Sequence, residues 1–251
     1  MANLKVGASG ILKGIAIRSK RPSPNYYGWV YPSKGITIHH MAGTSFDSAG
    51  ARFEQGSAQA SAHYGVGPGY IQQYVGEEHG AWHGGCTFAN TKTIGIETLN
   101  STGAPDWKVS DETYDTLVSL VADIAYRHGI YPLKHGKNVF GHREYAELYG
   151  AGPTACPGPY LFPRLDDICK KANRLVAWKK GDYSKGLTKT TDALIVRTGP
   201  GKNYPRATNK DGSYYTLPKN CRCNIVEVRN GFGKLKNGRG WTNMKWQKPR
   251  W

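Results

Sequence analysis

The sequence lacks the features of a membrane-spanning or disulfide-stapled protein. It has no run of about 18 apolar residues, so we expect no transmembrane helix. Its first segment, MANLKVGASGILKGIAIRSKRPS, contains no apolar block of ~7–15 residues because Lys13 and Gly14 interrupt it. Five cysteines in 251 residues are few and odd in number, which argues against a disulfide framework. We therefore expect a protein made in a cytoplasm without a signal peptide of its own.

Acidic side chains are scarce in the C-terminal part of the chain. Residues 178–251 carry 17 Lys/Arg and 4 Asp/Glu, a net charge of +13, whereas residues 1–177 carry 17 and 14, a net charge of +3. All eight histidines precede residue 143. The first part therefore suits site chemistry and the second an anionic surface, for which nucleic acid, anionic lipid and acidic cell-wall polymer are candidates.

The chain is long enough for one good core and a small second domain. A boundary is expected in the polar segment AWKKGDYSKGLTKTT, residues 177–191, which gives predicted domains at 1–177 and 178–251. In the first domain, alternating apolar residues predict strands at 35–40 and 93–99, and a strand pair around Pro68-Gly69. Helical spacing predicts helices at about 110–129 and 163–176.

These patterns predict an α/β fold, with a mixed central β-sheet flanked by helices. In the second domain, short β runs such as DALIVRTGPGKNYP, CRCNIVEVRN, FGKLKNGRGWTN and MKWQ alternate with Gly, Pro and Asn turns. They predict a small all-β barrel.

The residue types alone allow a zinc site but do not establish one. His39 ends a predicted strand, His142 lies in VFGHRE, and Cys156 lies in the rigid loop GPTACPGPYL. Two imidazoles and a thiolate form a three-ligand set with one open position for water. A buried cysteine beside unrelated histidines, or a nucleophilic Cys156 with His142 as its base, also fits these residues.

Six segments in order resemble the type 2 N-acetylmuramoyl-L-alanine amidases, the zinc amidase fold shared with peptidoglycan recognition proteins and phage lysins. They span about residues 23–176 and read GITIHHMAG, SAHYGVG, AWHGG, TIGIETLN, GHRE and TACPGPYL. Two of them, ITIHHMAG and TACPGPYL, are especially similar to phage endolysins and prophage amidases of Gram-positive hosts.

The resemblance assigns roles by position. It makes His39, His142 and Cys156 the ligands of Zn²⁺, although many members have Asp at the cysteine position. Glu97 matches the acidic residue that moves protons between water and the leaving nitrogen, a contribution of typically ~10²–10⁴-fold. His40, the neighbour of His39, is expected to point to the other face and to be structural.

The sequence departs from the family pattern at two places. Thr154 stands where many members have Lys or His, so only a hydrogen bond to the oxyanion is expected from it. Ala62 stands where some members have a catalytic tyrosine. His63, Trp82 and His83 fall where the family lines its substrate groove, and they could instead hold the ligands from behind or be structural.

The remaining histidines and cysteines have no motif support. His79, His128 and His135 are expected on the surface. Four cysteines outside the zinc set are expected to be buried thiols or small core residues: Cys86, Cys169, Cys221 and Cys223.

Residues 183–248 resemble bacterial SH3-like wall-binding domains, through ALIVRTGPGKNYP and NGFGKLKNGRGWTNMKW. This resemblance implies binding of wall peptide or glycopeptide, with anionic wall polymers as a second attraction. Tyr204, Trp241 and Trp246 are candidates for the groove, and aromatic residues in so small a barrel are as often core.

Three functions follow for comparison. The first is hydrolysis of the amide between N-acetylmuramic acid and L-alanine in Gram-positive peptidoglycan, by a phage or prophage endolysin or by a bacterial autolysin. The second is a non-catalytic peptidoglycan receptor, which the complete ligand set disfavours. The third is a nucleic-acid binder, for which no recognised motif is present. We expect neither a nucleic-acid nor a membrane partner, and the sequence does not predict an oligomeric state.

Overall fold

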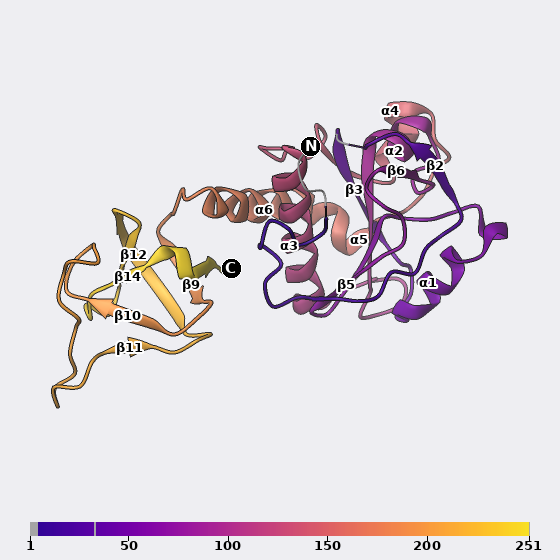
Figure 1. The fold of residues 1–251 in the computed structure, drawn as a ribbon. Coiled ribbons are helices and arrows are strands. Elements are labelled where there is room, and N and C mark those ends of the chain that lie inside the picture. The colour runs from indigo at the N-terminus through magenta and orange to yellow at the C-terminus, as the bar shows by residue number, and fades with distance from the viewer. Residues whose placement is uncertain (1–4, 33, 251) are drawn as a thin grey trace. The chain divides into compact units, whose positions relative to one another are not determined.

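The computed structural model describes residues 5–32 and 34–250, and the chain divides into two compact units, Met1–Asn173 and Arg174–Trp251. Figure 1 shows both units. Residues 1–4 of the N-terminal segment, in which we expected no signal peptide, lie outside the described residues. Within the described part of the chain, no helix combines the length and apolar character needed to cross a bilayer.

The first unit alternates strands and helices. Its strands are β1 Ala16–Ile17, β2 Tyr26–Trp29, β3 Gly35–His40, β4 Tyr64–Gly67, β5 Tyr70–Gln73, β6 His79–Ala81, β7 Thr93–Thr98 and β8 Val139–Gly141. Its helices are α1 Phe46–Phe53, η1 Gly56–Ala58, α2 Thr87–Lys92, α3 Asp111–His128, α4 Glu144–Tyr149, α5 Gly158–Leu161, η2 Phe162–Arg164 and α6 Leu165–Lys179, which ends in the second unit.

A six-stranded mixed sheet forms the centre of this unit, in the order β1-β5-β4-β7-β3-β8. Strands β4, β7, β3 and β8 run parallel to one another. Strand β5 runs antiparallel to β4 across the predicted Pro68-Gly69 turn, and β1 runs parallel to β5. The two inner strands are buried because both of their faces are covered. Their register pairs Ile36 with Ile94 and His39 with Glu97. This sheet confirms the expected mixed α/β architecture.

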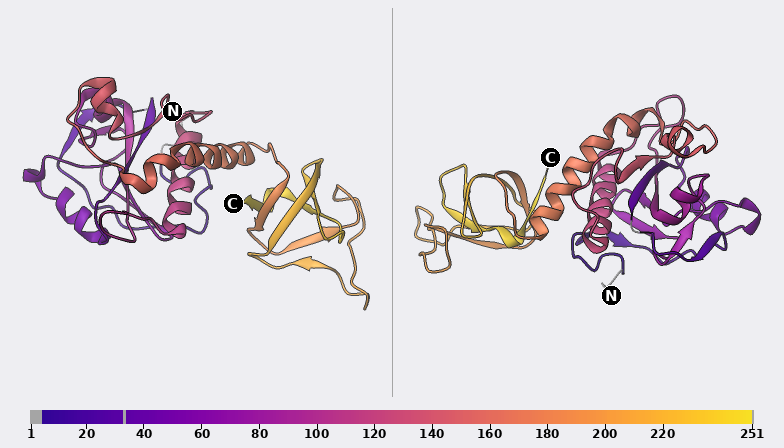
Figure 2. Two further views of the ribbon diagram at one scale, coloured as in Figure 1. Left: turned by 180° about the vertical axis from the view of Figure 1, so that it is seen from behind. Right: turned by 90° about the horizontal axis from the view of Figure 1, so that it is seen from above.

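Helix α3 covers one face of the sheet, beside β4, as the views in Figures 1 and 2 agree. The Ser110 side chain caps its first turn by accepting from the Thr113 amide, and Gly129 ends it in the left-handed conformation. The predicted apolar stripe, including Leu117, Val121 and Ile124, is fully buried. Strand β6 and helix α2 lie against β7. Strand β6 pairs with β2 in a separate two-stranded sheet, which the sequence patterns did not predict.

The second unit is all-β apart from the end of α6 and one short turn. Its strands are β9 Gly186–Thr190, β10 Leu194–Arg197, β11 Thr216–Leu217, β12 Arg222–Arg229, β13 Phe232–Leu235, β14 Trp241–Asn243 and β15 Gln247–Pro249. They form one antiparallel sheet in the order β11-β10-β14-β13-β12-β9-β15. The segment MKWQ differs from the prediction: Met244–Trp246 form a 3₁₀ turn, η3, because Asn243 Oδ1 accepts the Lys245 amide, and the strand begins at Gln247.

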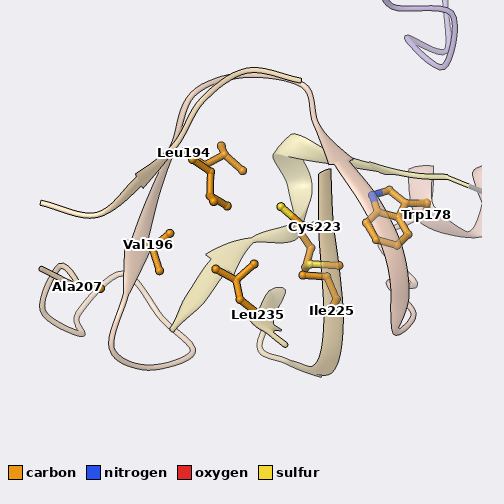
Figure 3. Packing of buried hydrophobic residues seen from close by; sticks show 9 residues of the cluster. Trp178, Leu194, Val196, Ala207, Cys223, Ile225 and Leu235 are labelled. Carbon is orange, nitrogen blue, oxygen red and sulfur yellow. The ribbon is translucent and has the colours of Figure 1, made fainter. Parts of the chain in front are cut away.

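A compact apolar core holds this unit together, and Figure 3 shows it from close by. Leu194 and Val196 of β10 face Cys223 and Ile225 of β12 across the core, with Leu235 of β13 between them. Cys223 is thus the small core residue that the sequence predicted. Trp241 is also buried and serves packing, whereas Tyr204 is 45% exposed.

Candidate metal centre

The carboxyl ends of three neighbouring strands bring the candidate site residues together. His39 lies on β3, Glu97 is its register partner on β7, and His142 directly follows β8, whose Gly141 pairs with Ile38. Because these strands are parallel, their carboxyl ends meet at one edge of the sheet, and register partners project to the same face. Residues about a hundred positions apart in sequence therefore lie side by side.

The third donor is the sulfur of Cys156, which lies in the loop after α4. One donor atom from each of His39, His142 and Cys156 lies within 4.8 Å of the other two. Cys156 Sγ is 3.5 Å from His39 Nδ1, and the rings of His39 and His142 have centroids 4.8 Å apart. Among the described residues, this is the group of His, Cys, Asp or Glu side chains whose spacing suits a metal ion.

The Cys156 loop is held from two sides. The Arg143 amide donates to the Cys156 carbonyl at 2.8 Å, which fixes the loop against the end of β8. The Thr154 hydroxyl accepts the Cys156 amide at 3.2 Å. Thr154 therefore shapes the loop around the thiol, and its hydroxyl proton remains available for the oxyanion contact expected of it.

A chain of hydrogen bonds behind His39 fixes which of its nitrogens is free. His83 Nε2 lies 3.3 Å from the Thr93 carbonyl, which can only accept, so this nitrogen carries the proton. His83 Nδ1 is then an acceptor, and it lies 3.1 Å from His39 Nε2, which must donate. His39 Nδ1 is left with its lone pair toward Cys156, as a metal ligand requires.

Asn90 is a functional residue that the sequence reasoning did not identify. Its side-chain oxygen accepts the backbone amides of His83 at 3.0 Å and Gly84 at 2.7 Å. These bonds hold the segment that carries the His83 ring. A polar residue in a short helix gives no sequence signal for this role, because the contact depends on how α2 packs beside β6.

Burial keeps both histidines neutral. It lowers the pKa of His39 well below its usual value, and the nearby His142, His83 and His40 add to this effect. Burial also lowers the pKa of His142. Neutral imidazoles are the form that binds metal.

The Cys156 thiol has its pKa raised by burial and then by the charge of Glu97. Nucleophilic catalysis needs a thiolate, so these surroundings disfavour a nucleophilic cysteine. A divalent cation between the three donors would favour the thiolate instead.

Glu97 has the environment of a proton carrier. Burial raises the pKa of its carboxyl group to about 8, and Arg52 opposes this shift. Its Oε2 atom is buried and accepts no hydrogen bond from the described residues. A buried carboxyl oxygen without a partner is costly to stability alone, so its presence indicates a ligand or substrate group at this point.

The donor set fits zinc. Zinc is bound by His nitrogen at ~2.0–2.1 Å and Cys sulfur at ~2.3 Å, and a catalytic zinc has three protein ligands with one open position. His39 Nδ1, a nitrogen of His142 and Cys156 Sγ provide these three. Glu97, the register partner of His39, lies on the adjacent strand.

The candidate groove residues divide into different roles. His83 contacts His39 from behind, which fits the alternative in which it holds a ligand. His63 is fully buried; its Nε2 donates to the His79 carbonyl and its Nδ1 accepts the Gly95 amide, so its placement fits the structural alternative. Trp82 is half-buried, with its ring 5.8 Å from that of Tyr27. His40 packs edge-on against Trp107 and is absent from the donor group, as its alternation predicted.

The expectation that His79, His128 and His135 are surface residues was wrong for His128. Its side chain is 4% exposed and its Nε2 lies 2.8 Å from Glu77 Oε2. Glu77 also pairs with Arg127 in a buried network that joins the loop before β6 to the end of α3. His79 and His135 are half-buried. Buried charge pairing across two elements has no short-range sequence pattern.

Comparisons with known proteins agree with this geometry. A family profile described as N-acetylmuramoyl-L-alanine amidase matches residues 30–159, slightly more than half of the chain. The matched range contains all three donors and Glu97. No curated protein matches the chain.

Several solved structures have a similar fold. The Staphylococcus aureus hydrolase AmiA in complex with its ligand is 17% identical, with a TM-score of 0.59, over 71% of this chain and 91% of that chain. The catalytic domain of XlyA and a mutant endolysin from Bacillus subtilis are each 20% identical, over 63% of this chain and 99% of theirs, with TM-scores of 0.51 and 0.50. At these identities the likeness shows the fold.

Proposed function

The chain belongs to the N-acetylmuramoyl-L-alanine amidase family, and from this premise we propose that it is a zinc hydrolase with Glu97 as its proton carrier. Its reaction is hydrolysis of the amide bond between N-acetylmuramic acid and L-alanine in peptidoglycan. The finer proposal is that His39, His142 and Cys156 hold the zinc ion. We also propose that the protein works as a phage or prophage endolysin on Gram-positive walls, with a bacterial autolysin as the alternative.

One observation carries this proposal. Three donor atoms from distant parts of the chain lie within 4.8 Å of one another, beside a carboxyl oxygen that is buried and unpaired. A structural zinc site would need a fourth protein ligand. Three donors and a free carboxyl group support a catalytic site instead.

Each residue has a defined task in the hydrolysis. When bound, zinc polarises the scissile carbonyl group and lowers the pKa of water to about 7. Glu97 Oε2 takes a proton from the attacking water and returns it to the L-alanine nitrogen as the C–N bond breaks. A carboxyl group whose pKa is about 8 when no cation is bound can hold that proton near neutral pH, and a nearby cation lowers the pKa toward the range of a base. His83 and the Thr93 carbonyl keep His39 Nδ1 free of its proton.

The second unit supports attachment to the wall. Residues 178–251 carry the net charge of +13, and their sheet borders a cleft of about 580 Å³. Arg222 and Lys236 line this cleft with Tyr215 and Asn224, and no acidic side chain is among its described lining residues. We propose that this unit is an SH3-like module that binds wall peptide or anionic wall polymer.

The amidase proposal is tested on purified cell wall. Hydrolysis of this amide releases new L-alanine amino termini without new reducing sugar, whereas a muramidase or glucosaminidase releases reducing ends. We expect His39→Ala to lose metal and activity, and Glu97→Ala to keep metal and lose ~10²-fold or more of turnover. Cleavage that persists unchanged after chelation and dialysis would refute the metal proposal, and full activity of Glu97→Ala would assign proton transfer elsewhere.

The wall-binding proposal is tested separately by co-sedimentation. The full chain with Glu97→Ala is mixed with purified wall, or with duplex DNA, at physiological salt. We expect it to sediment with the wall and to leave the DNA free. Preference for the duplex would instead favour the nucleic-acid hypothesis.

A further inference from the structure

Tyr74, which directly follows β5, carries a hydroxyl group with no hydrogen-bond partner among the described residues. The residue is 3% exposed, and its ring packs edge-on against Phe53, with centroids 5.2 Å apart, and against Ala62. No atom of the described residues forms a hydrogen bond with its oxygen. A phenylalanine would fill the same space without the cost of burying an unpaired hydroxyl. Packing therefore accounts for the ring but not for the oxygen.

The position of Gly65 places this oxygen beside the proton carrier. A Cβ atom built on Gly65 of β4 would stand 2.7 Å from the Tyr74 oxygen. Gly65 is also the register partner of Glu97 on the adjacent parallel strand β7. Adjacent strands lie ~5 Å apart and their register partners project to the same face. The hydroxyl and the Glu97 side chain therefore share one face, and the missing side chain of Gly65 lets the Tyr74 oxygen approach the strand next to Glu97.

The two groups are complementary. The Tyr74 hydroxyl is a buried donor and Glu97 Oε2 is a buried acceptor, and neither has a partner in the part of the chain that the structure describes. They act on each other electrostatically, since the charge of Glu97 is the largest cause, after burial, of the raised pKa of Tyr74. Because they do not bond directly, one small polar molecule between them would satisfy both.

We propose that Tyr74 is a positioning residue for Glu97, whose hydroxyl donates to a water molecule that donates in turn to Glu97 Oε2. This bridge holds the carboxyl group in one orientation beside the three donors. A carboxyl group without it would sample other rotamers of its side chain and meet the attacking water less often. The inference rests on the proposed role of Glu97 in the reaction.

The test combines structure and kinetics on the full chain. A high-resolution crystal structure should show a water between the Tyr74 and Glu97 oxygens, and the Tyr74→Phe variant should lack it. Loss of the hydrogen bond to the bridging water predicts a fall in kcat of about 2- to 10-fold for Tyr74→Phe, with little change in KM. Tyr74→Phe with wild-type kcat, or a wild-type structure without this water, would overturn the inference.

Two further variants separate positioning from stability. Tyr114→Phe is the matched control, because it removes a hydroxyl group of α3 that donates to Asp167 of α6 at 2.7 Å. It should lower the melting temperature and leave kcat unchanged. Tyr74→Phe should instead lower kcat without lowering the melting temperature. Gly65→Ala puts a Cβ atom 2.7 Å from the Tyr74 oxygen, so it should displace the hydroxyl group and lower kcat, and combining it with Tyr74→Phe should add little.

Failure of the two proposals can be told apart. If the wild-type protein does not cleave the wall amide, the proposed function fails, and the density between Tyr74 and Glu97 still decides whether they share a water. If the wild type cleaves but Tyr74→Phe loses only thermal stability, the hydroxyl is structural and the inference alone fails.

Discussion

The bond between His39 Nε2 and His83 Nδ1 predicts how a residue behind the metal centre controls metal affinity. We consider His83→Leu, which replaces the imidazole ring with an apolar side chain of similar size and so removes both ring nitrogens. His39 is 1% exposed, so its Nε2 proton would lose its only acceptor without gaining water. The cost of such an unpaired buried donor is about 1–3 kcal/mol.

The loss should appear as weaker zinc binding. Removing a partner of a ligating histidine typically costs ~10–100-fold in metal affinity, which equals about 1.4–2.7 kcal/mol. The assay is competition for zinc between the full chain and a chelating fluorescent indicator at fixed pH and salt. His83→Gln is the matched variant, because its amide can accept from His39 and donate to the Thr93 carbonyl, and it should recover most of the affinity.

Two results would refute this reasoning. Wild-type affinity in His83→Leu would show that the hydrogen-bond chain does not fix the His39 tautomer. Equal losses in the Leu and Gln variants would show that shape, rather than hydrogen bonding, is what His83 contributes.

Three other predictions concern acid stability, the third ligand and the basic cleft. Burial holds the pKa of His63 at about 4 against 6.5 for the unfolded chain; the unfolded state therefore binds more protons between these values. The free energy of unfolding should fall by up to ~3 kcal/mol as pH drops from about 6.5 to 4. In a His63→Gln variant that folds, the melting temperature should fall less over this pH range. For Glu77, burial raises the pKa, but the hydrogen bonds from Arg127 and His128 outweigh burial and hold the pKa at about 2. The ionised Glu77 therefore contributes to the free energy of unfolding above pH ~4.5, and this contribution is lost as the pH falls below that value. Cys156→Ala should lose zinc on dialysis whereas Cys156→Asp should retain it, because a carboxylate oxygen is also a zinc ligand; equal zinc content by metal analysis would contradict the third-ligand assignment. Arg222→Glu with Lys236→Glu should reduce co-sedimentation with wall several-fold at low salt and less at high salt, and unchanged binding would exclude the cleft.

The central sheet could be predicted from the sequence because its signals are local. Alternation at 35–40 and 93–99 identified β3 and β7, and the same alternation placed His39 and Glu97 on one side of the sheet. The cap at Ser110, the apolar stripe and Gly129 predicted α3 to within one residue at each end. The all-β character of the second unit followed from its regular turns.

Residues whose roles depend on packing could not be predicted. The β2–β6 layer has only seven residues in its two strands, which is too short for a period to emerge. Asn90 acts through contacts of α2 with the segment after β6, and its position belongs to no short motif. For His83 the motif AWHGG left several roles open, and its contacts with His39 and the Thr93 carbonyl depend on packing. Tyr74 looks like one more aromatic residue in QQYV, and its relation to Glu97 follows only from the register of β4 with β7. The Glu77 network likewise joins residues 50 positions apart.

The most direct test of the account is anomalous X-ray scattering at the zinc edge from crystals of the full chain grown with zinc. We predict one strong peak in the first unit, bonded to His39 Nδ1, a nitrogen of His142 and Cys156 Sγ, with Glu97 beside it and no fourth protein ligand. A peak at any other set of residues, or no peak among these three donors at saturating zinc, would contradict the central claim.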